Sequence, residues 1–107
     1  MSLDNKKDKG IQSVIQIDRL VHEPARMLIM AILLSVENAD FLFLLKQTGL
    51  TRGNLSSHLS KLETAGYVSI TKEFVDKIPR TLLTATDGGS DAFENYRRRM
   101  IGILENC

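Results

Sequence analysis

The side chains best suited to chemistry in this 107-residue chain lie on one short segment, Thr51–Thr64. At about 100° per residue, a helix over this segment places Leu55, Leu59 and Leu62 on one side. The opposite side then collects small or hydrogen-bonding residues, namely Gly53, Asn54, Ser56, Ser57, Ser60, Lys61 and Thr64. Serine, asparagine and glycine each lower helix stability by up to ~1 kcal/mol relative to alanine. Their presence on this face therefore indicates that the face contacts another molecule, because it does not favour helix formation.

This polar face has the chemistry needed to bind a nucleic acid duplex. Asn54 and Ser57 can hydrogen-bond to base edges, and Gly53 leaves room near a helix N-terminus, whose free N–H groups favour phosphate. For His58, at the border of the leucine stripe, two interpretations stay open: a phosphate contact, or a half-buried imidazole hydrogen-bonded to the backbone. The residues expected to contact DNA from this helix are Thr51, Arg52, Gly53, Asn54, Ser56, Ser57, His58, Ser60 and Lys61.

Basic residues are concentrated in the middle third of the chain. The whole sequence has a formal net charge of only +1. Residues 46–80, however, contain six basic and three acidic side chains, a local charge of +3, whereas residues 11–45 contain two basic and four acidic ones, a local charge of −2. Lys72, Lys77 and Arg80 are therefore candidates for phosphate or minor-groove contacts; the alternative is that they keep a hairpin edge soluble.

The elements that must position the serine-bearing helix follow from capping and turn residues. Residues 11–21 show a loose helical pattern, and Pro24 then suits the first turn of a new helix. That helix should run through Leu34 and form the centre of the core, because it is apolar almost all round. After a polar break over residues 37–40, Asp40 caps a short helix over residues 41–48, and Gly49 ends it. Thr51 caps the serine-bearing helix.

A β-hairpin is predicted after that helix. Gly66 can take the left-handed conformation that turns the chain into residues 67–74, where the hydrophobic period changes from about 3.6 to 2. Residues 76–79 read as a turn, and residues 81–86 as a β-branched partner strand. The apolar residues on one side of the first strand are Val68, Ile70 and Phe74.

A last helix follows the hairpin, capped by Thr86 or Asp87, and its apolar side should pack against the core helix. Two short helices joined by a glycine turn, the second followed at once by a two-stranded hairpin, give the order of a winged helix-turn-helix. The predicted fold is α+β and mostly helical: a winged helix-turn-helix with a two-stranded β-hairpin wing and a C-terminal helix. We expect residues 1–10 to form a flexible tail and residues 11–107 a single domain.

The run Leu50–Val68 resembles the recognition helix and following strand of prokaryotic winged-helix transcriptional regulators related to the MarR and ArsR families. Residues 22–26 resemble the start of their first core helix, residues 40–41 that of their second, and residues 79–81 their descending wing strand. The resemblance implies a sequence-specific regulator of double-stranded DNA, with the recognition helix in the major groove and the wing on the flanking backbone or minor groove. It also implies a homodimer joined through terminal helices, for which the candidate residues are Phe93, Tyr96, Met100 and Ile103.

Other classes of protein have little support in the sequence. The apolar run over residues 27–36 is far shorter than the ~20 residues that span a bilayer, and the first ten residues do not form a secretory signal, so we expect a cytoplasmic protein. The single cysteine, Cys107, and the two histidines, His22 and His58, do not have the spacing of a metal site. No nucleophile with a nearby base and no phosphate-binding glycine loop is present, so we predict neither an enzyme nor a cofactor.

Two further hypotheses stand beside DNA binding. A winged-helix module could bind protein and not DNA, because Leu42 and Phe43 are predicted to be exposed and because Glu63, Glu73 and Asp76 could interrupt the positive strip. A small-molecule effector could also bind in a cleft between the wing, the core helix and the dimer helices, although no residue identifies its chemistry.

Overall fold

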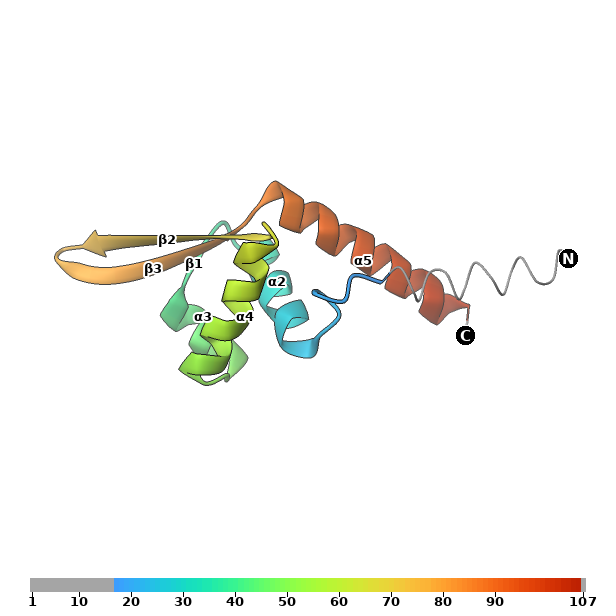
Figure 1. The fold of residues 1–107 in the computed structure, drawn as a ribbon, viewed down its shortest axis with the longest axis horizontal. Coiled ribbons are helices and arrows are strands. Elements are labelled where there is room, and N and C mark those ends of the chain that lie inside the picture. Colours follow the sequence, from blue (N-terminus) through green and yellow to red (C-terminus); the bar gives the residue numbers. More distant parts are fainter. Residues whose placement is uncertain (1–16, 107) are drawn as a thin grey trace, which may run out of the picture.

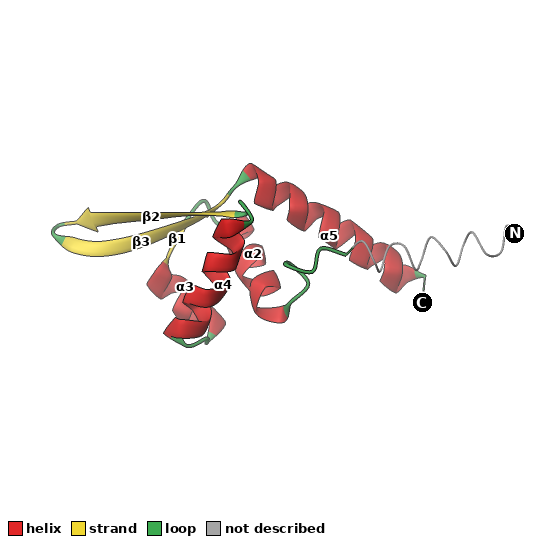
Figure 2. Ribbon diagram, viewed as in Figure 1, coloured by secondary structure: helices red, strands yellow, loops and turns green. Residues whose placement is uncertain are grey.

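The computed structural model describes residues 17–106 and confirms the predicted α+β winged helix (Figure 1). The tail predicted over residues 1–10, the pattern over residues 11–16 and Cys107 lie outside the described residues. Helices α2, α3 and α4 form one group, the strands β2 and β3 extend from it as a long hairpin, and α5 leads away on the other side (Figure 2). The elements are α2 (Pro24–Ser35), β1 (Ala39–Asp40), α3 (Phe41–Thr48), α4 (Arg52–Thr64), β2 (Val68–Val75), β3 (Ile78–Ala85) and α5 (Asp87–Glu105).

Three helices begin at the capping residues that the sequence predicts. Asp40, Thr51 and Thr86 occupy the N-caps of α3, α4 and α5, and their side-chain oxygens accept hydrogen bonds of 2.7, 3.1 and 3.0 Å from backbone N–H groups of the first turn. Gly49 and Gly66 follow α3 and α4 with φ angles of 70° and 80°, in the left-handed region that favours glycine. These local signals therefore determine where α3 and α4 begin and end and where the chain turns toward the wing.

The segment before α2 is not helical, so the predicted helical pattern reaching Val21 is wrong over residues 17–21. Asp18 Oδ1 accepts hydrogen bonds from the N–H groups of Leu20 at 2.9 Å and Val21 at 3.2 Å, which fold the chain into a turn. The other carboxylate oxygen accepts a 2.6 Å hydrogen bond from the Tyr67 hydroxyl. This segment is thereby attached to the residue that precedes β2.

The Tyr67–Asp18 hydrogen bond should make stability depend on pH in the alkaline range. That hydrogen bond, together with burial, raises the pKa of Tyr67 from 10.0 to about 12. Since folding favours the neutral phenol, its contribution is complete below pH 10.0 and is lost as the pH rises toward about 12. We expect the free energy of unfolding, measured by urea titration across this range, to fall further in the wild type than in Tyr67→Phe. Equal falls in the two proteins would contradict this assignment.

The hairpin turn is shorter than predicted. Asp76 and Lys77 alone connect β2 to β3, and both have positive φ angles, 52° and 68°, as a two-residue type I′ turn requires. Strand β3 therefore begins at Ile78, with Pro79 opposite Phe74, and the predicted turn over residues 76–79 and the strand start at residue 81 are wrong. Phe74, expected on the same side as the core residues of β2, is 76% exposed because the hairpin extends beyond the core.

A short third strand lies where the sequence predicts a polar break. Strand β1 pairs antiparallel with β3, with Ala39 opposite Leu83 and Asp40 opposite Leu82, so the sheet order is β1-β3-β2. A strand of two residues is too short to show the alternating hydrophobic pattern by which a sequence reveals a strand. Its pairing also depends on the distant residue Leu83, which is fully buried. The predicted two-stranded hairpin is thus the larger part of a three-stranded sheet.

The core lies where α2, α3 and α4 meet the base of the hairpin. Helix α2 is central as predicted, but although it is apolar almost all round, only one of its sides is buried: Met27, Leu28 and Leu34 are 38%, 43% and 38% exposed. The leucine stripe of α4 is buried as predicted. The buried core residues of the helices and strands include Ile29, Met30, Leu33, Leu44, Leu55, Leu59, Leu62, Val68 and Leu83.

Candidate nucleic-acid interface

The side of α4 opposite its leucine stripe is open to solvent, as the sequence predicts. Within the described part of the chain, the side chains of Asn54, Ser56, Ser57 and Ser60 form no hydrogen bond to the protein, so their polar groups are available to a ligand. A Cβ atom built on Gly53 meets nothing within 4 Å, which agrees with the expected open approach to the helix N-terminus. The exposed residues of this face are Arg52, Gly53, Asn54, Ser56, Ser57, Ser60, Lys61 and Thr64.

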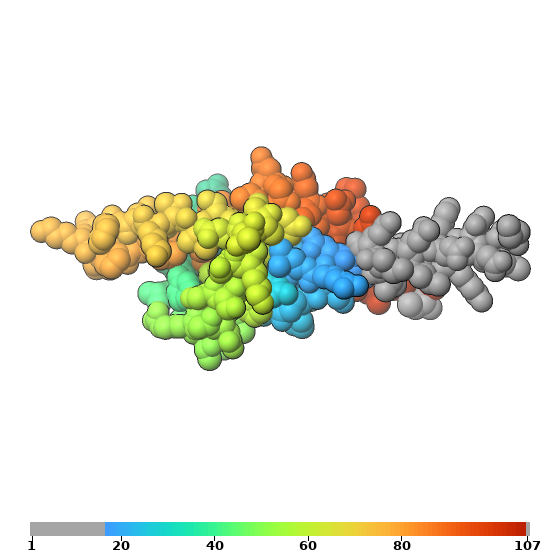
Figure 3. All heavy atoms as spheres, viewed as in Figure 1, coloured from blue at the N-terminus to red at the C-terminus, as the bar shows by residue number. Residues whose placement is uncertain are grey.

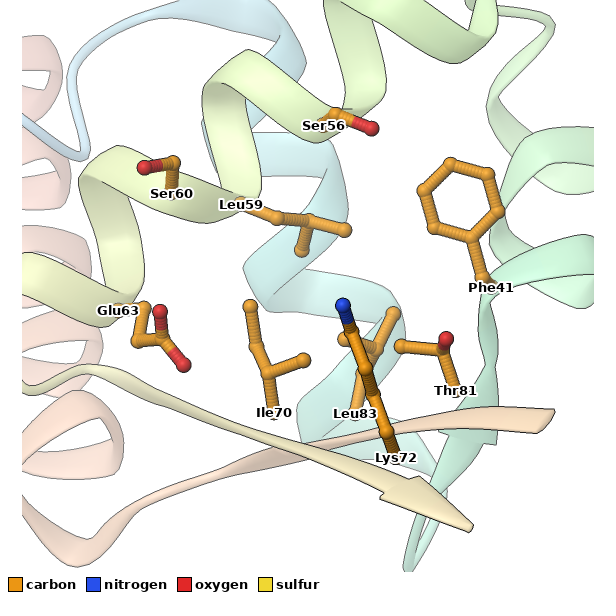
Figure 4. A pocket seen from close by; sticks show the side chains of 9 residues that line it. All are labelled: Phe41, Ser56, Leu59, Ser60, Glu63, Ile70, Lys72, Thr81 and Leu83. Atoms are coloured by element: carbon orange, nitrogen blue, oxygen red, sulfur yellow. The ribbon is translucent and has the colours of Figure 1, made fainter. Parts of the chain in front are cut away.

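A groove of about 310 Å³ separates α4 from the wing (Figure 4). Lys72 points from the wing toward α4, so one of the three cations predicted on the wing lies beside the serine-bearing face. Thr81 lies in the same groove and was missed by sequence reasoning, because only the folded hairpin brings β3 close to α4. The groove has an apolar floor of Leu59, Ile70 and Leu83, and the polar residues that line it are Ser56, Ser60, Glu63, Lys72 and Thr81.

His58 is joined to the start of α2 by side-chain contacts. Its Nδ1 lies 3.0 Å from Arg26 Nη1 and 3.7 Å from Glu23 Oε2, so the expected alternative of a backbone hydrogen bond is wrong. Because a guanidinium can only donate, Nδ1 is the acceptor in this hydrogen bond. Burial raises the pKa of the Glu23 carboxyl, but hydrogen bonds from the backbone N–H groups of Arg26 and Ala25, together with the Arg26 guanidinium, leave that pKa below its ordinary value. These contacts attach α4 to α2, and the phosphate contact of His58 stays a prediction.

The predicted cations differ in how far their charge is already neutralised. Arg80 Nη2 lies 3.4 Å from Asp40 Oδ2, so this candidate for a wing contact is already paired with a carboxylate of the same chain. Lys77 lies in the turn at the tip of the wing. Among the described residues, four cations along α4 and the wing form no ion pair: Arg52, Lys61, Lys72 and Lys77.

Helix α5 carries the residues predicted for dimerisation, and one of them is already buried by contacts within the chain itself. Tyr96 is 5% exposed; its hydroxyl lies 2.8 Å from His22 Nδ1 and donates to Met27 Sδ at 3.5 Å, which confirms the predicted packing against α2. The other three candidates, Phe93, Met100 and Ile103, are half-buried. Sequence reasoning missed Ile101 and Leu104, which are 39% and 66% exposed on the same helix.

Residues 17–106 contain neither a membrane-spanning helix nor a metal-binding cluster. None of the helices there has both the length and the apolar character needed to cross a membrane. No group of three or more His, Cys, Asp or Glu side chains gathers there in the manner of a metal site.

Comparison with known proteins places this geometry in a family. Residues 25–104 match the family model of a winged helix DNA-binding domain. An uncharacterized protein of Methanocaldococcus jannaschii is 32% identical over 88 residues, which are 82% of this chain and 96% of that protein. A transcriptional regulator homologue from Pyrococcus horikoshii OT3 superposes with a TM-score of 0.83 at 28% identity, over 92% of this chain and 96% of that one.

A regulator of the MarR family from Silicibacter pomeroyi has a TM-score of 0.63 at 18% identity, over 94% of this chain and 67% of that one, a likeness of fold. The fold expected from the resemblance to MarR-type regulators is confirmed. On the evidence of its sequence match and its architecture, the chain belongs to the winged helix DNA-binding domain family.

Proposed function

We propose that this chain is a homodimeric, sequence-specific transcriptional regulator of double-stranded DNA that acts in the cytoplasm. The observation that carries the proposal is the outer side of α4, where the side chains of Asn54, Ser57 and Ser60 are exposed and make no hydrogen bond within the described protein. A helix of this kind can lie in a major groove, where such side chains hydrogen-bond to base edges.

The positive charges around α4 support the same placement of this helix in a major groove. Arg52 and Lys61 lie on α4 itself, and Lys72 lies across the groove on the wing, so cations border the polar face on more than one side. In the proposed complex these cations bind phosphates, while Asn54 and Ser57 read the bases. The wing then lies on the flanking backbone or in the adjacent minor groove.

Dimerisation is proposed through α5. Ile101 and Leu104 expose apolar surface on this helix, and Met100 and Ile103 are half-buried beside them. A second copy would cover this surface and place the two α4 helices for half-sites about one helical turn apart on the DNA.

The proposal predicts that Asn54→Ala combined with Ser57→Ala abolishes sequence preference. Lost base contacts cost about 1–3 kcal/mol for each good pair, so the preference for a selected duplex over a scrambled one should fall at least about 10-fold, whereas affinity for scrambled DNA should change little. The measurement is fluorescence anisotropy with a duplex selected from random DNA by the full chain.

Ser90→Ala is the matched control, because Ser90 is an exposed serine on α5 and borders a different groove, between α2 and α5. The control should retain the preference. Unchanged preference in the double variant, or failure of the wild type to enrich any duplex, would reject the proposal.

A protein-binding module is the second candidate, and one observation favours it. Leu42 and Phe43 on α3 are 60% and 41% exposed, as predicted, and form an apolar spot on the helix before α4. Acidic side chains also interrupt the cations, since Glu63 lines the groove beside Lys72. Failure to enrich DNA, with loss of partner binding in Phe43→Ser, would favour this candidate.

A further inference from the structure

The tip of the wing is apolar and uncovered. Phe74 is 76% exposed and Ile78 67% exposed, the two highest values among the exposed large hydrophobic residues, and Val75 is 40% exposed. All three lie next to the two-residue turn, where the hairpin projects from the body as a narrow arm (Figure 3). Packing within the protomer therefore does not account for these side chains.

The two faces of the hairpin carry different residues at this tip. Residues directly opposite in an antiparallel pair share a face, and successive pairs alternate. The pairs Ile70–Leu83 and Lys72–Thr81 face α4 across the groove (Figure 4). The pair Phe74–Pro79 is the next on that same face, whereas Val75 and Ile78 form a pair on the other face.

This register sets how far along the wing each side chain lies from Ile70, which faces α4. At about 3.3 Å per residue, Lys72 lies roughly 7 Å beyond Ile70 along β2, and Phe74 roughly 13 Å beyond it. If α4 occupies a major groove, as the proposed function states, Lys72 is then at the level of the phosphate strand that borders this groove, and Phe74 is beyond that strand. The next surface along the duplex is the minor groove.

The chemistry of the tip suits that surface. A minor groove is about 6 Å wide, and a two-stranded ribbon that ends in a two-residue turn is narrow enough to approach it. Lys72, one step back on the same face, and Lys77, in the turn, can bind the phosphates on either side, and neither has an ion-pair partner among residues 17–106. Phe74 then meets deoxyribose and base-step surface, which is apolar.

We propose that Phe74 is an apolar wedge that enters the minor groove beside the α4 site and partly unstacks one base step. The inference rests on the proposed function and adds a contact that is neither ionic nor a base-edge hydrogen bond. Apolar wedges of this kind kink a duplex by roughly 20–90° toward the major groove.

The test uses the full chain and a duplex selected from random DNA, with the fluorescent base analogue 2-aminopurine at successive flanking positions. Wild-type protein should raise the fluorescence at one flanking step on each side and shorten the end-to-end distance measured by energy transfer. Phe74→Ala should lose both signals and weaken binding by roughly 10-fold or more, the value expected when one phenylalanine is no longer buried. This loss should be the same at low and high salt, because no counterion is involved.

Ile78→Ala is the matched control, since it removes a similar exposed side chain from the opposite face of the same tip. It should leave fluorescence, bending and affinity unchanged. Thermal unfolding of both variants should match the wild type, because both side chains are largely exposed.

Three results would overturn the wedge. The first is a wild-type complex in which no flanking analogue brightens; the second is equal weakening by Phe74→Ala and Ile78→Ala. The third is a loss of self-association in Phe74→Ala by sedimentation, which would identify the tip as a contact between copies. If sequence preference still depends on Asn54 and Ser57 in these experiments, the wedge fails while the proposed function stands; if no duplex is selected, the proposed function fails.

Discussion

Gly89→Ala is expected to destabilise the protein by about 3 kcal/mol, the upper part of the range for overpacked sites. Gly89 is buried in the first turn of α5, and a Cβ atom there would lie 2.1 Å from the carbonyl oxygen of Tyr67 and 2.9 Å from its carbon. Both are backbone atoms, and this oxygen also accepts a 3.0 Å hydrogen bond from Thr86 N–H. The start of α5 would have to move away from the chain that leads into the wing.

Two other glycines of α5 provide matched controls for this experiment. A Cβ atom on Gly88 would make ordinary contacts at 3.6 and 3.7 Å, and one on Gly102 would meet nothing within 4 Å. Alanine at Gly102 should stabilise the helix by up to ~1 kcal/mol, and alanine at Gly88 should change stability by less than about 1 kcal/mol. The free energy of unfolding is measured by urea titration of circular dichroism. A Gly89→Ala protein as stable as Gly88→Ala would show that this close packing is absent.

Affinity for the selected duplex should fall by about 10³–10⁵ between 50 and 200 mM salt, if a dimer binds about 6–10 phosphates. The structure offers a source for these contacts. Each protomer has four cations along α4 and the wing that form no ion pair among the described residues: Arg52, Lys61, Lys72 and Lys77. Two protomers would supply eight, a number within that range.

Single variants test which cations contribute to this salt dependence. Lys61→Ala should reduce the slope of log affinity against log salt by about 2 in a dimer, since each phosphate contact contributes about 0.9. Arg80→Ala should reduce it less, because Arg80 is paired with Asp40. Arg98→Ala is the control: Arg98 lies on α5, where its Nε is 3.2 Å from Glu94 Oε1, and the slope should not change. A wild-type slope near zero would exclude phosphate binding by these cations.

Most of the fold could be predicted because its boundaries depend on local chemistry. Asp40, Thr51 and Thr86 hold the first turns of their helices through their own side chains, and Gly49 takes a conformation that other residues avoid. Each of these signals acts within four residues, so a single sequence contains all the information needed. The exposed side of α4 follows from the same kind of reasoning, because its leucines recur with the period of the helix.

The features that could not be predicted depend on residues far apart in the chain. Strand β1 exists because Ala39 meets Leu83, and the backbone alternative for His58 is wrong because folding brings the ring to Arg26, 32 positions away. The exposure of Phe74 likewise depends on how far the core extends beneath the hairpin, which periodicity does not report. A hydrophobic pattern of period two shows which face of a strand is apolar, but it does not show where along the strand the core beneath that face ends.

Asp40 has two roles at once, because one of its oxygens caps α3 while the other pairs with Arg80 on strand β3 of the wing. A rotation of the wing away from the helices would separate that pair and pull the carboxylate from the free N–H groups of α3. Gly49 ends α3 and begins the short connection to α4, so the same rotation would also displace α4. The two contacts of this one carboxylate therefore couple the position of the wing to that of α3 and α4 before any ligand binds.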